Sequence, residues 1–206
     1  MCRKSVKYIV FFIFMTVSVL YAQDYPGGYD PNAENSGDKV KKIAPYFLID
    51  LKFPKFPDKW ATELGGGAGI LFKKTFALSV EYYSLLSNNI RVQVDNERDY
   101  VLGLGYGGLS AAYTLFPLDF IMLSAGAFGG LGRATNSYQN VLGVSNYSVD
   151  DWFFTGDLRA KLGVKIFMGL WIGATAGYRF ASGLNYYNIG NKDLTGLYLS
   201  VGLFTF

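Results

Sequence analysis

The sequence predicts an all-β protein: an eight-stranded antiparallel transmembrane β-barrel with short periplasmic turns and longer extracellular loops. Three observations predict this fold. The chain begins like an exported protein, and segments of about ten residues then alternate apolar with polar or small side chains. Short and long connections also alternate between these segments. This combination is typical of strands that cross a bilayer as a closed barrel, in which every backbone hydrogen bond is satisfied internally.

Residues 1–22 are predicted to form a cleaved secretory signal peptide. Basic residues precede the apolar run YIVFFIFMTVSVL, and Ala22 offers a small residue for cleavage. This run is shorter than the roughly 20 residues that a spanning helix needs. An uncleaved anchor is the alternative, because Leu20 is larger than the usual residue at its position before the cut.

Cleavage at Ala22 changes what the composition implies. It removes three of the 19 basic residues and none of the 16 acidic ones, so the formal charge of +3 falls to zero. The remaining chain therefore gives no argument for nucleic-acid binding. Cys2, the only cysteine, leaves as well, which excludes disulfides. Residues 23–44 are rich in Pro, Gly and Asn and are predicted to be a flexible N-terminal segment, either a plain tether or a plug or docking segment.

Residues 45–206 are predicted to form one barrel domain. In residues 46–53 (YFLIDLKF), four apolar side chains share one face and Asp50 and Lys52 lie on the other. Glu63 and Glu81 take the corresponding positions in the next two strands. The eight predicted strands are 46–53, 61–72, 76–83, 100–116, 120–132, 151–164, 170–180 and 195–206.

The fourth and fifth segments are rich in glycine. In residues 100–116 the apolar positions change parity near Gly107–Gly108, which predicts a β-bulge there. Residues 100–132 also contain GxxxG spacings, so a membrane-embedded helical hairpin is an alternative. The density of glycine and the Phe116–Pro117 break favour strands.

The sixth segment, DWFFTGDLRAKLGV, alternates most clearly. Asp157, Arg159 and Lys161 occupy every second position, whereas a helix would scatter them around its circumference. The seventh segment adds Arg179 on its polar face. An arginine or lysine facing the bilayer midplane costs roughly 2–4 kcal/mol, so we expect the charged faces to line the lumen. The predicted lumen network comprises Asp50, Lys52, Glu63, Glu81, Asp157, Arg159, Lys161 and Arg179.

Four acids and four bases in so narrow an interior predict a salt-bridged plug. A narrow channel whose charges select ions is the alternative. A soluble barrel of lipocalin type, with the apolar faces inward, is a further alternative. Aromatic residues at the ends of the apolar stripes favour the membrane, where such residues form interfacial girdles.

The long connections 84–99, 133–150 and 181–194 are expected to lie outside the cell. Their tyrosines are candidate contacts for an extracellular ligand: Tyr138, Tyr147, Tyr186 and Tyr187. Asp95, Glu97 and Asp99 are interpreted as a solvated loop face, although calcium could use such a cluster. We predict no metal and no cofactor.

The chain ends VGLFTF, and its architecture over residues 45–206 resembles the small eight-stranded outer-membrane barrels of the OmpA, OmpX and OmpW type. The resemblance implies a location in the cell outer membrane and contact with outer-membrane lipid. It also implies recognition by the barrel-assembly machinery through Phe204 and Phe206. Leu197, Leu199 and Leu203 have the opposite parity, so either the last strand contains a bulge or its aromatics do not all face lipid.

The resemblance leaves three functional classes open. The first is a structural and surface-interaction barrel acting through its long loops, and the second is an OmpW-like conduit for small solutes. The third is an enzyme, but the known barrel enzymes use a histidine base and this chain contains no histidine. We therefore expect a non-enzymatic protein.

Overall fold

The structure is a computed structural model that describes residues 43–205, apart from 57–58, 87–89, 96–97, 141–142, 146–150, 168 and 187–188. For residues 91–100, 136–140 and 143–145 it describes the backbone alone. No helix in this described part is long and apolar enough to cross a membrane.

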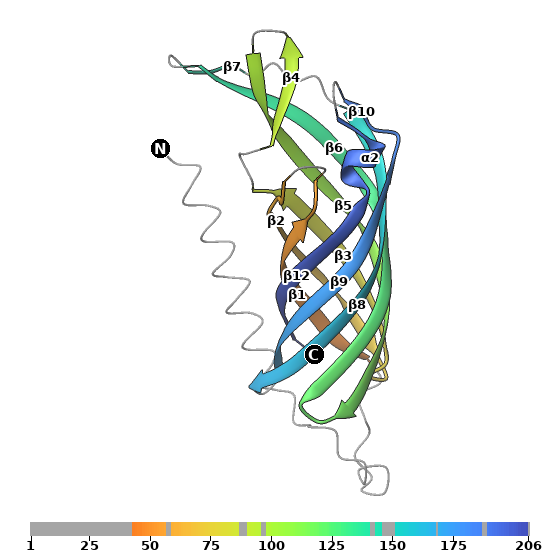
Figure 1. Cartoon of the computed structure of the whole chain (residues 1–206). Coiled ribbons are helices and arrows are strands. Elements are labelled where there is room, and N and C mark those ends of the chain that lie inside the picture. The colour runs from red at the N-terminus through yellow and green to blue at the C-terminus, as the bar shows by residue number, and fades with distance from the viewer. Residues whose placement is uncertain are drawn as a thin grey trace, which may run out of the picture.

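Eight strands close into a barrel (Figure 1). All neighbours in the ring are antiparallel, and β1 pairs with β12 to close it. The sequence prediction of an eight-stranded antiparallel barrel is confirmed, and the helical hairpin over residues 100–132 is excluded. In ring order the strands are β1 (Ile43–Pro54), β2 (Glu63–Phe72), β3 (Phe76–Leu85), β5 (Arg98–Leu118), β6 (Ile121–Asn140), β8 (Asp151–Phe167), β9 (Leu170–Ser182) and β12 (Gly196–Thr205).

The two ends of the barrel differ. At one end, short turns join β2 to β3, β5 to β6 and β8 to β9, and we call this the turn end. At the opposite loop end, β5 and β6 continue past the predicted strands (Figure 1, upper part). The loop end also carries β4 (Arg91–Asp95), β7 (Gly143–Ser145), β10 (Asn185–Tyr186), β11 (Ile189–Gly190) and the short helix α2 (Asn191–Leu194).

The predicted bulge at Gly107–Gly108 is wrong. The pairing of β5 with both β3 and β6 is continuous through these glycines. Even-numbered residues point inward along the strand, from Leu102 to Thr114. The apolar pattern changes parity for another reason: near the loop end the lumen itself is apolar, so Leu102 and its neighbours face inward there.

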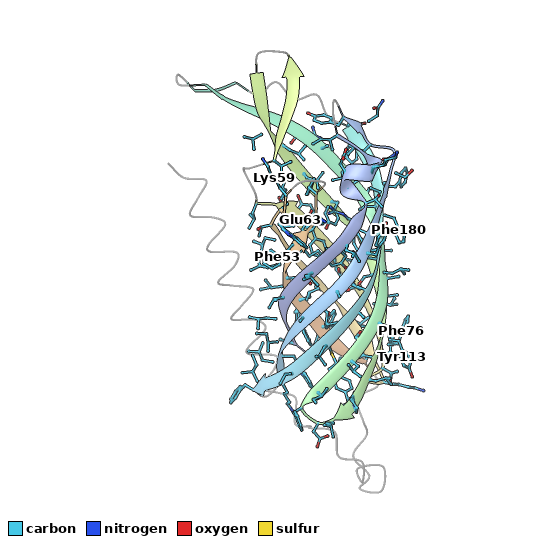
Figure 2. All side chains as sticks on the ribbon, in the orientation of Figure 1. Phe53, Lys59, Glu63, Phe76, Tyr113 and Phe180 are labelled. Atoms are coloured by element: carbon cyan, nitrogen blue, oxygen red, sulfur yellow. The ribbon has the colours of Figure 1, made fainter. Side chains whose placement is uncertain are left out.

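The outer surface of the barrel is apolar. Val80, Leu158 and Leu199 are exposed midway along their strands, between aromatic residues near both ends. Figure 2 shows Phe180 towards the loop end and Phe76 and Tyr113 towards the turn end. A soluble barrel would have the opposite arrangement, with its apolar residues inside, so the lipocalin-type alternative is wrong.

Candidate functional site

The lumen of the barrel is filled by three layers of side chains. Near the loop end an apolar cluster includes Tyr83, Tyr106, Phe128 and Phe153. A charged belt follows in the middle, and a second apolar cluster near the turn end comprises Tyr46, Leu48, Met122, Trp171 and Phe204. All eight charged residues assigned to the lumen from the sequence lie on its inward-facing positions, with Arg159 and Lys161 bordering a small cavity there.

One chain of ion pairs joins β1, β8 and β3. Lys52 Nζ lies 3.1 Å from Asp157 Oδ2. Arg159 makes a bidentate pair with Glu81, with Nη1–Oε2 and Nη2–Oε1 distances of 2.8 Å and 2.7 Å. Arg159 Nε also lies 3.8 Å from Asp157 Oδ1, which links the two pairs. Two strands of the ring separate β1 from β8, and two others separate β8 from β3, so the Lys52–Asp157 and Arg159–Glu81 pairs cross the lumen.

A separate ion pair lies nearer the loop end. Arg179 of β9 donates from Nη1 to Glu63 Oε1 of β2 at 2.7 Å. Tyr106 donates its hydroxyl hydrogen to the other Glu63 oxygen at 2.6 Å. Arg179 also donates from Nε to the backbone oxygen of Leu194, at the end of α2, at 2.7 Å. This arginine therefore connects the charged belt to the helix at the loop end.

Asp50 and Lys161 complete the belt outside these three ion pairs. Asp50 is buried. Lys161 Nζ donates to the Tyr46 hydroxyl at 3.3 Å and lies 4.7 Å from the centroid of the Phe204 ring. The sequence indicated the balance of charge across the lumen, but the choice of partners depends on how strands tilt and cross in space.

Hydroxyl groups surround the Glu81 carboxylate. Ser110 and Ser79 donate to Oε1 at 2.6 Å and 3.0 Å, and Tyr83 donates to Oε2 at 2.8 Å. With Arg159 these donors satisfy the buried carboxylate, as a buried charge requires. Ser79 and Ser110 were not predicted as members of the site. The available signal was that Ser79 shares the face of Glu81 in β3 and that Ser110 lies on the small-residue face of the neighbouring strand β5.

The described part of the lumen contains a small cavity. A cavity of about 20 Å³ lies near the charged belt. Glu81, Arg159 and Lys161 border it together with hydroxyl side chains from β3, β5 and β6. A single water needs roughly 10–15 Å³ by this measure, so the cavity has room for little more than water.

The tyrosines assigned to surface contacts have different positions. Tyr186 is 1% exposed and belongs to the apolar cluster near the loop end, so its prediction as a surface contact is wrong. Tyr186 pairs with Ile189 between β10 and β11, and both side chains are buried in that cluster. Tyr138 lies in β6, where its backbone pairs with Ser145. Tyr147 and Tyr187 lie outside the described residues.

The C-terminal strand has no bulge. Its register with β1 and β9 is continuous, and Leu197, Leu199 and Leu203 face outward. Phe204 therefore points into the lumen, where its ring stacks on Trp171 with centroids 6.5 Å apart. This resolves the two alternatives for the strand in favour of an inward aromatic. Phe206 lies outside the described residues.

Chemically, the site holds six of its eight charged side chains in ion pairs. Among the residues whose side chains the structure describes, no group of three or more His, Cys, Asp or Glu could hold a metal ion. The side chains of Asp95, Glu97 and Asp99 lie outside that set. The carboxylates of Glu63, Glu81 and Asp157 are engaged by arginine or lysine, so the arrangement can bind strands together across the lumen.

The sequence matches no protein-family model and no curated protein. Solved structures with the same fold exist. Neisserial surface protein A is similar with a TM-score of 0.59 and 12% identity, covering 82% of this chain and 99% of that one. The N-terminal β-barrel domain of OprF from Pseudomonas aeruginosa is similar with a TM-score of 0.50 and 14% identity, covering 81% and 98%. The chain thus has the fold of the small eight-stranded outer-membrane barrels.

Proposed function

We propose that this chain is a bacterial outer-membrane β-barrel protein that acts at the cell surface through its loop end, without enzymatic activity. The observation that carries the proposal is the filled lumen, which three ion pairs cross between two apolar clusters. A barrel closed in this way offers its outer surface to lipid and its loop end to partners. The outward apolar belt and the predicted signal peptide and assembly signal, Phe204 with Phe206, support the outer-membrane location.

The described part of the loop end offers basic, amide and aromatic side chains to a partner. Lys59 and Trp60 are exposed in the connection between β1 and β2, and Trp60 is 55% exposed. Asn185 and Lys192 are exposed in the connection between β9 and β12. Tyr138, Tyr147 and Tyr187 remain candidates for the same surface.

Substitution at this surface tests the proposed role. Cells that export a Lys59→Glu, Trp60→Ser, Lys192→Glu variant are expected to lose adhesion to matrix-coated plates, while the barrel still folds. Lys165→Glu, at the turn end, is the matched control and should leave adhesion unchanged. Equal adhesion of the loop-end variant and the unmodified barrel, at equal surface levels, would exclude these residues as the contact surface.

A narrow channel is the second candidate function. The cavity bordered by Arg159 and Lys161 is the observation that favours it, because charged groups beside water are what an ion path needs. Recordings in planar bilayers distinguish the two functions. The plug predicts no steady conductance for the unmodified barrel, whereas steady conductance that changes in Lys161→Ala would establish the channel.

A further inference from the structure

We propose that the lumen contains an aromatic cage that binds an ammonium ion, and that Lys52 of the same chain occupies it as a tethered ligand. Lys52 Nζ lies 3.6 Å from the centroid of the Tyr83 ring and 4.7 Å from that of Tyr198. The centroids of Phe128 and Tyr106 lie 5.7 Å and 5.8 Å away. All four distances fall within the roughly 6 Å range over which a ring attracts a cation.

The four rings come from four different strands and pack on one another. Tyr83 of β3 stacks on Tyr106 of β5, with centroids 5.3 Å apart. Phe128 of β6 meets Tyr83 and Tyr106 edge-on, with centroid distances of 6.1 Å and 6.0 Å. Tyr198 of β12 approaches the ammonium independently of these three rings. The cage is thus built from residues distant in sequence.

Asp157 supplies the counter-charge. Its Oδ2 atom lies 3.1 Å from Lys52 Nζ, and the lysine side chain is only 2% exposed. A buried ammonium has lost its water and needs a partner for its charge. Here one carboxylate and the faces of aromatic rings replace that water, and aromatic cages of this kind recognise quaternary ammonium ligands.

Contacts that do not involve Lys52 hold two rings of the cage in place. The Tyr83 ring packs against Gly65 and the Tyr198 ring against Gly177, where any Cβ atom would collide with the ring. The Tyr83 hydroxyl donates to Glu81 at 2.8 Å, which fixes the ring from its other end. Because Lys52 takes part in none of these contacts, the rings are expected to keep their places when the lysine side chain is removed.

The ligand class follows from the atoms that Lys52 contributes. Substitution Lys52→Ala removes the methylene chain beyond Cβ and the ammonium group, which together correspond to n-propylammonium. The emptied cage is therefore expected to bind small primary alkylammonium ions. The neutral molecule n-propanol has the same shape without the charge and is expected to bind far more weakly. This site is separate from the loop-end surface and does not depend on whether the lumen conducts.

The experiment uses the refolded full-length Lys52→Ala barrel in detergent micelles. n-Propylammonium is expected to raise its apparent melting temperature in a saturable way, by about 5–10 °C at roughly 100 times the dissociation constant. n-Propanol should give no such rise, and neither should n-propylammonium with the unmodified barrel. Lys161→Ala is the matched control, because the Lys161 ammonium lies 4.7 Å from the centroid of the Phe204 ring, away from the cage rings, and takes part in none of the three ion pairs.

The proposal would be overturned if n-propanol raised the melting temperature of Lys52→Ala as much as n-propylammonium does, or if n-propylammonium raised that of Lys161→Ala equally. The absence of saturable binding to folded Lys52→Ala would also overturn it. A second measurement does not require that variant to fold. In the unmodified barrel, ring currents should shift the NMR signals of the Lys52 ε-methylene protons upfield of those of the exposed Lys73, and Tyr83→Leu should reduce this shift. Lys52 signals at the position of the Lys73 signals would contradict the cage directly.

Discussion

Arg159 and Glu81 face each other across the lumen in a bidentate ion pair, with N–O distances of 2.8 Å and 2.7 Å. They belong to β8 and β3, which share no backbone hydrogen bonds in the ring because β5 and β6 lie between them. The pair therefore ties together strands that the sheet connects only indirectly. Its strength depends on burial, since both side chains have exchanged water for each other and for neighbouring hydroxyls.

Removing one member of this pair should destabilise the barrel strongly. Glu81→Gln leaves the Arg159 guanidinium buried without a full counter-charge, and the free energy of unfolding is expected to fall by about 3–5 kcal/mol. Urea unfolding from lipid vesicles measures this loss. The double variant Glu81→Gln, Arg159→Met should recover part of it, because no unpaired charge then remains. A double variant less stable than the single variant would contradict this account.

The glycine beneath the Tyr83 ring should tolerate no side chain. Gly65→Ala places a Cβ atom into that ring, so we expect a loss of about 1–3 kcal/mol in the free energy of unfolding. Tyr83→Leu in the same chain should relieve the collision, giving a combined loss smaller than the sum of the two. Gly129→Ala is the control, because nothing lies within 4 Å of the added Cβ atom there. Equal losses at both glycines would show that the collision is not the cause.

A charge on the outer face distinguishes lipid from water as the surrounding medium. Leu158 is 58% exposed midway along β8. In a bilayer, Leu158→Arg should lower the free energy of unfolding by about 2–4 kcal/mol, as charged residues do at the midplane. Leu86→Arg, at the loop end, should change it by no more than about 0.5 kcal/mol. The measurement is unfolding from vesicles, and equal small effects at both positions would argue against a membrane-facing belt.

The inward aromatic of the last strand should contribute to stability as a core residue. Phe204 is 1% exposed and packs on Trp171, so Phe204→Ala should create a cavity and lower the free energy of unfolding by about 3–5 kcal/mol. Leu203→Ala, on the outward face of the same strand, should have a smaller effect. Thermal unfolding followed by heat-modifiable gel migration compares the two variants. The opposite ranking would indicate that Phe204 does not face the lumen in the folded barrel.

Much of the fold was predictable because alternation in a strand reflects its two environments. Asp157, Arg159 and Lys161 share one parity and Leu158 the other, and this pattern identified a strand and its two faces. The same reasoning failed in residues 100–106. There both faces carry small or apolar residues, so parity does not say which face is inward. The inward-facing Leu102 and Tyr106 therefore led to the wrong prediction of a bulge.

By itself, the sequence determined the number of strands in the barrel, their antiparallel order and the balance of four acids against four bases on the polar faces. These properties are local, since each depends on the alternation within one segment or on the length of one connection. Only the tertiary structure decided which acid meets which base, that Tyr186 turns inward, and that four rings surround Lys52. Those relationships join residues from strands far apart in the chain, and they depend on strand tilt and register around the closed ring, which no single segment specifies.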